Sequence, residues 1–141
     1  MKRVILDTNC LLVSLPKISP YRNVWDSFLA GGFELCVSTE ILNEYHEIIS
    51  AKTNPVVADN VLSTILNADN VLYSTPYYRF GLIVADGDDN KFVDCCIATG
   101  ASFIVSNDRH FDVLADIPFP HVEVLNIGEF SRSLWKNPQT D

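Results

Sequence analysis

The amino-acid sequence predicts an α/β domain, a three-layer α/β/α sandwich whose five-stranded, mainly parallel sheet carries helices on both faces. Short apolar segments of strand length alternate with longer segments of helical periodicity. The run at residues 4–6 is apolar without alternation, which is typical of a strand buried on both faces. The chain shows no internal repeat and no linker, so we expect one domain over residues 1–135 and a disordered tail over residues 136–141.

Each element is justified by its composition and its boundaries. The predicted strands are apolar runs between turn or capping residues: residues 3–7, 33–37, 71–73, 103–106 and 122–125. The predicted helices cover about residues 10–15, 20–30, 39–50, 55–67, 90–99, a short segment after Asp108, and 128–135. Capping residues or a cap followed by proline mark the helix starts: Asp7-Thr8-Asn9, Ser19-Pro20, Ser38 or Thr39, and Asn54-Pro55. Glycine or proline marks the helix ends: Gly31-Gly32, Gly100, Pro118 and Pro120.

Composition narrows the classes of function. The net charge of −8 and the ten scattered Lys and Arg residues argue against a broad basic surface for nucleic acid. The sequence contains neither an apolar run long enough to span a membrane nor a signal-peptide pattern, so we expect a cytoplasmic protein. The four cysteines lack metal-site spacing and lie in apolar segments, where we expect them to be buried thiols.

Four acidic residues occupy positions with apolar neighbours: Asp7, Glu44, Asp94 and Asp108. Asp7 and Asp108 each end an apolar strand, and parallel sheets bind ligands at the carboxyl ends of their strands. Glu44 lies at the edge of the apolar stripe of its helix, and Asp94 interrupts a helix that is apolar nearly all round. Carboxylates beside apolar surface are costly unless a cation neutralises them. If the fold gathers the four acids, their counter-ion is a divalent cation, which predicts a metal-dependent enzyme acting on phosphate.

Three of these acids also have a structural explanation. Asp7 and Asp108 suit the N-cap of the helix that follows each of them. Asp94 lies three residues after Lys91, close enough for an ion pair on one helix face.

Several neighbouring charges are expected to have other roles. Glu40 and Glu47 project from the opposite face of the helix that carries Glu44, so we expect them to be solvated. Asp88 and Asp89 are expected to form a turn or a cap rather than to bind metal. Two basic residues flank the acids, and either a phosphate contact or ordinary surface charge explains them: Lys91 and Arg109.

Four segments together resemble the PIN-domain family. They read Val-Ile-Leu-Asp-Thr-Asn at 4–9, Ser-x-x-Ile-Leu-x-Glu at 38–44, Asp-Asp-Asn-Lys-Phe-x-Asp at 88–94 and Ile-Val-Ser-Asn-Asp at 104–108. The pattern is most similar to the VapC-like branch, the toxin components of bacterial toxin–antitoxin pairs.

The resemblance implies a five-stranded α/β/α fold and Mg²⁺- or Mn²⁺-dependent cleavage of single-stranded RNA. It places the family's acidic quartet, which is both catalytic and metal-binding, on Asp7, Glu44, Asp94 and Asp108. It assigns supporting polar positions to Asn9 and Ser106, and it implies an antitoxin partner and a homodimer. Hard oxygen ligands independently favour Mg²⁺ or Mn²⁺ over zinc.

Two other classes of function remain as alternatives. A phosphatase of the haloacid-dehalogenase type also begins with an Asp after its first strand, but it requires a second Asp two residues later, where this chain has Asn9. A non-catalytic PIN-fold domain that binds nucleic acid or protein would usually have lost one or more of the acids.

Overall fold

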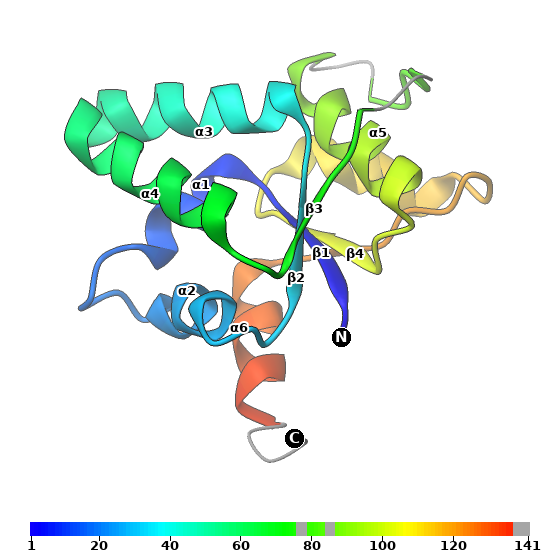
Figure 1. Ribbon diagram of the computed structural model, residues 1–141. Coiled ribbons are helices and arrows are strands. Elements are labelled where there is room, and N and C mark those ends of the chain that lie inside the picture. Colours follow the sequence, from blue (N-terminus) through cyan, green and yellow to red (C-terminus); the bar gives the residue numbers. More distant parts are fainter. Residues whose placement is uncertain (76–78, 84–86, 137–141) are drawn as a thin grey trace.

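A five-stranded parallel sheet forms the centre of the computed structural model, which describes residues 1–75, 79–83 and 87–136 (Figure 1). The strands are β1 (Arg3–Leu6), β2 (Glu34–Val37), β3 (Val71–Tyr73), β4 (Phe103–Val105) and β5 (Val124–Leu125). Their order is β3-β2-β1-β4-β5, and every neighbouring pair is parallel. The register between the two central strands pairs Val4 with Phe103 and Leu6 with Val105.

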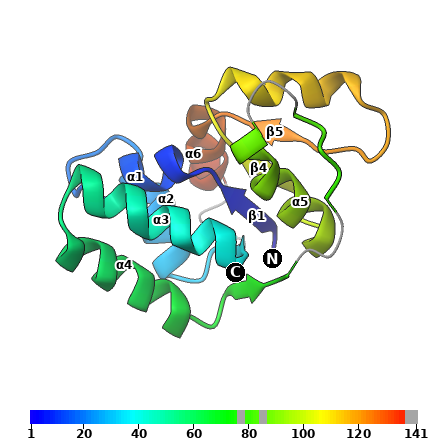
Figure 2. The same cartoon turned by 90° about the horizontal axis from the view of Figure 1, so that it is seen from above.

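Helices cover both faces of this sheet. They are α1 (Thr8–Ser14), α2 (Arg22–Leu29), α3 (Thr39–Lys52), α4 (Pro55–Asn67), the 3₁₀ turn η1 (Gly87–Asp89), α5 (Asn90–Thr99), the 3₁₀ helix η2 (Arg109–Asp116) and α6 (Ile127–Lys136). Seen from above, α1 to α4 lie on one side of the strands, and α5 and η2 lie on the other (Figure 2). This arrangement follows from right-handed crossovers, because the chain moves outward from β1 to β3 and then crosses back to β4.

The core lies between these layers and is built from the apolar positions of the sequence pattern. Strand residues Val4, Ile5 and Leu6 are at most 1% exposed, as expected for a strand covered on both faces. Beneath α2, Trp25 and Phe28 pack with their ring centroids 5.3 Å apart. All four cysteines are buried and free. Burial raises the pKa of Cys10 to about 12, so its thiol stays neutral near pH 7.

The α/β/α class and the five strands predicted from the sequence are confirmed. The boundaries differ by a few residues, and the helix expected after Asp108 is a 3₁₀ helix. Among the described residues, no helix has both the length and the apolar character needed to cross a membrane. Of the tail expected over residues 136–141, Lys136 ends α6, and residues 137–141 lie outside the described part of the chain.

Candidate metal centre

The sheet topology brings the ends of β1 and β4 together at the carboxyl edge. Asp7 directly follows β1, and its backbone N–H donates to the carbonyl of Val105 at 3.0 Å, which extends the pairing of the two strands by one residue. Asp108 lies three residues after β4. The crossovers next to β1 and β4 lie on opposite faces of the sheet, and such a switch point is where α/β sheets commonly bind ligands.

Ser106 links these two acids. Its hydroxyl donates to Oδ2 of Asp7 at 2.7 Å and accepts the backbone N–H of Asp108 at 3.0 Å. Asp7 is 7% exposed, and this burial is the main reason why its pKa is raised. Hydrogen bonds from Ser106 and from the Thr8 backbone oppose the rise in pKa, whereas the charges of Glu44 and Asp108 add to it. Glu44 and Asp108 are therefore each close enough to Asp7 to repel its charge.

Glu44 reaches this group from α3 and is half-buried. Its Oε2 accepts a hydrogen bond from the hydroxyl of Thr8, and its Oε1 pairs with Nζ of Lys91 at 2.6 Å. Lys91 also donates to the carbonyl of Asp88 at 2.6 Å, and its side chain is only 11% exposed. The charge of Glu44 thus has a fixed partner within the protein.

A second group of side chains joins Asp108 from the other direction. Nδ1 of His110 lies 3.2 Å from Oδ1 of Asp108 and 3.4 Å from Oδ2 of Asp89. One ligand atom from each of these three residues lies within 4.8 Å of the others. Asp89 is 9% exposed and lies directly before α5, and the backbone N–H of His110 donates to Oδ1 of Asp108 at 2.9 Å. Two carboxylates and an imidazole therefore converge at one point.

Asp94, which the sequence placed with Asp7 and Asp108, lies elsewhere in the structure. Its Oδ1 accepts the backbone N–H of Phe80 at 3.1 Å, and its pKa is raised mainly by burial. The charges that act on it are those of Arg79 and Glu40. It lines a separate hollow of ≈250 Å³ together with both of these residues.

The family model described as the PIN domain matches residues 3–110, about three-quarters of the chain. This chain belongs to the PIN domain family. No curated protein matches it significantly.

Two solved structures share the fold of this PIN domain. A chain of VapBC2 from Rickettsia felis, bound to a promoter DNA fragment, superposes with a TM-score of 0.58 at 17% identity and covers 88% of this chain and 98% of its own. A chain of DNA-bound VapBC from Salmonella typhimurium has a TM-score of 0.57 at 20% identity, covering 90% and 99%. At these identities the comparison establishes the fold.

Two hollows of the PIN domain meet at Asp108. The smaller, of ≈220 Å³, is lined by Asp7, Asn9, Cys10, Val13, Asn107 and Asp108. The larger, of ≈590 Å³, includes Ser106, Asn107 and Asp108 and extends toward β5 and α6. Asn9, expected as a supporting polar residue, is exposed on the wall that it shares with Asp7. A ligand at Asp108 is therefore accessible from two sides.

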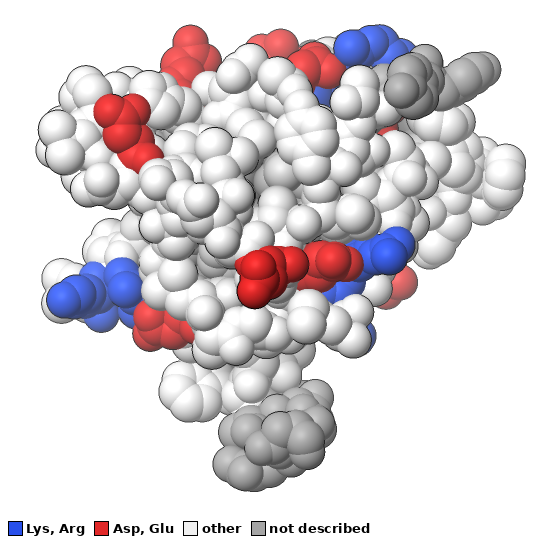
Figure 3. Space-filling view, viewed as in Figure 1, with Lys and Arg blue, Asp and Glu red and all other residues white. Residues whose placement is uncertain are grey.

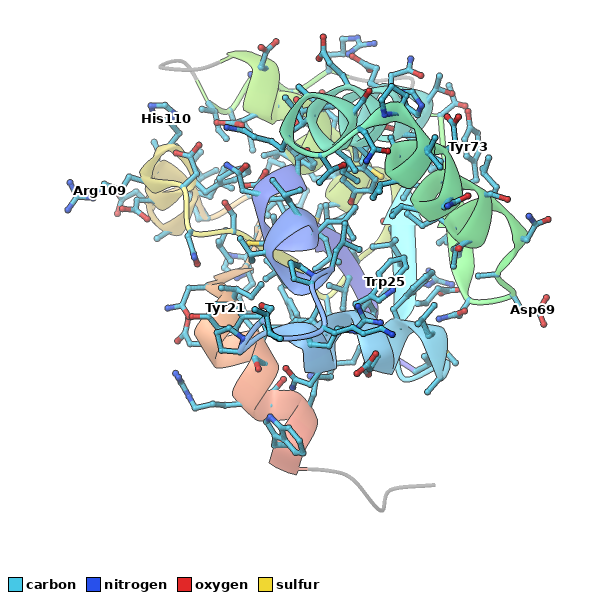
Figure 4. All side chains as sticks on the ribbon, turned by 90° about the vertical axis from the view of Figure 1, so that its left-hand side faces the viewer. Tyr21, Trp25, Asp69, Tyr73, Arg109 and His110 are labelled. Atoms are coloured by element: carbon cyan, nitrogen blue, oxygen red, sulfur yellow. The ribbon has the colours of Figure 1, made fainter. Side chains whose placement is uncertain are left out.

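The two basic residues near the acids differ in their availability. Lys91 is held by Glu44, and it is not the partner of Asp94 that helical spacing allowed. Arg109 is exposed, and in Figure 4 it extends outward from the first turn of η2, beside His110. Only Arg109 of this pair is positioned to meet a ligand that approaches from solvent.

The local sequence contains a signal for Asp89 that the apolar pattern obscured. A helix that connects parallel strands runs antiparallel to them, so its first residue lies at the carboxyl edge of the sheet. Asp89 is at that end of α5. Asp94 is five residues further on, about 7.5 Å along the axis and rotated by about 140°. Thr8 and His110 each follow an expected acid by one or two residues, and their contacts become evident only in the folded structure.

Proposed function

We propose that this PIN domain is a metal-dependent endoribonuclease that hydrolyses phosphodiester bonds of single-stranded RNA. The observation that carries the proposal is that two other acids lie beside Asp108: Asp7, which directly follows β1, and Asp89, which ends η1. Ser106 joins Asp7 to Asp108, and His110 joins Asp89 to Asp108. Gathering buried or half-buried carboxylates is costly without a cation, so the arrangement favours a divalent ion.

The donor set fits Mg²⁺ or Mn²⁺. Asp7, Asp89 and Asp108 supply hard oxygen ligands. The thiol of Cys10, in the hollow lined by Asp7 and Asp108, stays neutral. When bound, the ion would lower the pKa of a water nucleophile and stabilise the charge that develops on phosphate. In this proposal Asp89, and not Asp94, is the metal-binding acid next to α5, because Asp94 lies with Arg79 and Glu40.

The surrounding residues hold the acids in place. Ser106 orients Oδ2 of Asp7. Thr8 and Lys91 fix the two oxygens of Glu44, which places this carboxylate beside Asp7 to orient a water molecule or to accept its proton. Arg109 is exposed next to Asp108 and is the proposed phosphate contact.

The charge distribution bears on how RNA would bind. The net charge is −8, and the face in Figure 3 carries small separate groups of acidic and basic residues without a continuous basic surface. RNA affinity would therefore depend on the ion and on local contacts at the site more than on a general attraction to polyanions. A flexible single strand suits such a short contact better than a duplex does.

The decisive experiment compares two carboxamide variants in one RNA-cleavage assay. A fluorescent single-stranded RNA is incubated with Mg²⁺, Mn²⁺ or EDTA and with wild-type, Asp89→Asn or Asp94→Asn protein. We expect Asp89→Asn to lose at least about 100-fold in rate, because a ligand carboxylate is lost. Asp94→Asn should stay within about threefold of wild type, since its side chain contacts a backbone N–H outside the centre.

Two other outcomes would each contradict this assignment. A large loss in Asp94→Asn with wild-type activity in Asp89→Asn would return the role to Asp94. RNA binding without cleavage by the wild-type protein would favour the alternative of a non-catalytic binding domain. Circular dichroism of both variants controls for misfolding.

By analogy with the VapBC complexes, we also propose that the chain pairs with an antitoxin protein. The resemblance to the VapC-like branch is the basis for proposing a homodimer as well. Light scattering of the purified chain tests the dimer, which would have twice the 15.8 kDa mass of one chain. Co-purification with the product of a neighbouring gene tests the antitoxin.

A further inference from the structure

The position of His110 has a consequence for the identity of the metal ion. Its Nδ1 lies 3.2 Å from Oδ1 of Asp108 and 3.4 Å from Oδ2 of Asp89. Donor atoms that bind one ion at about 2.1 Å are separated by about 3.0 Å in octahedral and about 3.4 Å in tetrahedral geometry. Both spacings from the imidazole nitrogen thus match those of ligands on one ion, and one ligand atom of each of the three residues lies within 4.8 Å of the others.

We propose that His110 is a nitrogen ligand of the metal centre, so that the site prefers a first-row transition metal ion such as Mn²⁺ over Mg²⁺. This inference rests on the proposed metal-dependent function, and it deepens that function by naming the class of ion. Mg²⁺ favours an all-oxygen shell, whereas imidazole stabilises transition metal ions.

The local structure supports this role for His110. Its backbone N–H is fixed by Oδ1 of Asp108 at 2.9 Å, which anchors the start of η2 against the acid. The ring is 43% exposed, so it has room to present the Nδ1 lone pair while Nε2 carries the proton. Asp89 is the buried residue of the turn before α5. The nitrogen therefore already lies beside both acids, and the partly exposed ring can turn toward an ion that they hold.

The structural alternative is that His110 only donates a hydrogen bond to the two acids. In that case it would influence every divalent ion in the same way, through charge and orientation. Direct ligation instead predicts an effect that depends on the ion, and this difference separates the two roles.

The test uses Mn²⁺ as a spectroscopic probe and Mg²⁺ as the reference ion. Electron spin-echo spectroscopy of the Mn²⁺-loaded full-length chain detects directly coordinated ¹⁴N, and calorimetry measures the affinity for each ion. The variant is His110→Gln, which keeps a hydrogen-bonding side chain but offers an oxygen in place of the imidazole nitrogen. The matched control is His121→Gln, because His121 is exposed and lines the larger hollow beside Asp108.

We expect a ¹⁴N coupling in the wild-type protein and in His121→Gln and its loss in His110→Gln. The Mn²⁺ affinity of His110→Gln should fall at least about tenfold, and its Mg²⁺ affinity should change less than about threefold. Absence of the coupling in wild type, or equal losses for both ions, would overturn the proposal.

RNA cleavage by the same preparations distinguishes this inference from the proposed activity. Mn²⁺-dependent cleavage without a ¹⁴N coupling would contradict only the proposal that His110 is a metal ligand. A ¹⁴N coupling without RNA cleavage would support His110 as a metal ligand and contradict the proposed nuclease activity. Failure of the wild-type protein to bind Mn²⁺ would contradict both proposals.

Discussion

At Asp7, burial and neighbouring charge act in the same direction. Burial is the larger effect, and the carboxylates of Glu44 and Asp108 add to it, so the pKa of Asp7 is raised above its ordinary 3.8. Ser106 and the Thr8 backbone N–H oppose this effect through hydrogen bonds. A carboxylate in this position is suited to bind a cation. Without a metal ion, its ionised form lowers the stability of the folded protein.

Asp7→Asn should therefore increase stability while abolishing nuclease activity. A raised pKa means that the folded state binds the proton more tightly than the unfolded state does, so the carboxyl stabilises the fold below about pH 4 and loses that contribution as pH rises through the folded pKa. Asparagine carries no charge, so in EDTA the variant should melt higher than wild type at pH 7, and the difference should shrink toward pH 4. Thermal melts across this pH range measure the effect.

Asp94→Asn is a useful companion to Asp7→Asn. Burial also raises the pKa of Asp94, so this variant should gain stability in the same pH direction while retaining RNA cleavage. A melting temperature of Asp7→Asn below that of wild type at pH 7 would contradict this account of the burial cost at Asp7.

At the scale of the elements, α5 positions the centre through both of its ends. Asp89 lies at its amino end, and Gly100 ends the helix in the left-handed conformation with φ +66°. The same glycine leads the chain into β4, whose carboxyl end is followed by Asp108. The length of α5 and its C-terminal turn therefore determine where two of the proposed ligands lie.

Gly100→Ala should lower the free energy of unfolding by about 1 kcal/mol, because an L side chain is strained at this φ. A Cβ at Gly100 meets no atom within 4 Å, so the cost is conformational and not steric. Gly87→Ala is the matched control, since that position is equally open and does not have a positive φ. Urea unfolding measures both variants, and equal stability for the two would contradict the role of the left-handed turn.

The elements were largely predictable from local sequence, whereas the composition of the site was only partly so. Continuous apolar runs and capping residues predicted β1 and the starts of α3 and α4, because these features depend on neighbours in the chain. The cap predicted at Ser19-Pro20 was wrong, since α2 begins at Arg22 after Tyr21. The carboxyl ends of β1 and β4 predicted that Asp7 and Asp108 would lie close together. The apolar neighbours of Asp94 in the sequence led to the prediction that it binds the metal ion. In the structure they reflect its burial against the loop that contains Phe80.

Contacts between distant segments explain what the sequence could not supply. The pairing of Lys91 with Glu44 joins α5 to α3, and helical spacing alone had favoured Asp94 as the partner of Lys91. The contact between His110 and Asp89 joins η2 to η1. Both depend on how the layers pack, and local periodicity carries no information about that packing.

At the scale of the whole molecule, the proposed centre concentrates negative charge in a chain that already carries a net charge of −8. The acids lie after β1, on α3, at the end of η1 and directly before η2, in different layers or segments of the fold. An ion bound between them would connect these elements in the folded state and would have no preformed site in the unfolded chain. Ion binding should therefore stabilise the whole domain and not only the site.

Mn²⁺ should raise the melting temperature of the full-length chain in a way that depends on Asp89. At an ion concentration about 100 times the dissociation constant, preferential binding to the folded state contributes about 2.7 kcal/mol. For a chain of this length, that corresponds to a shift of about 5–10 °C. Differential scanning calorimetry with Mn²⁺ or EDTA should show the shift in wild type and in Asp94→Asn and its near absence in Asp89→Asn. An equal shift in Asp89→Asn would mean that the ion stabilises the domain from another position, because the Asp89 carboxylate would then contribute nothing to its binding.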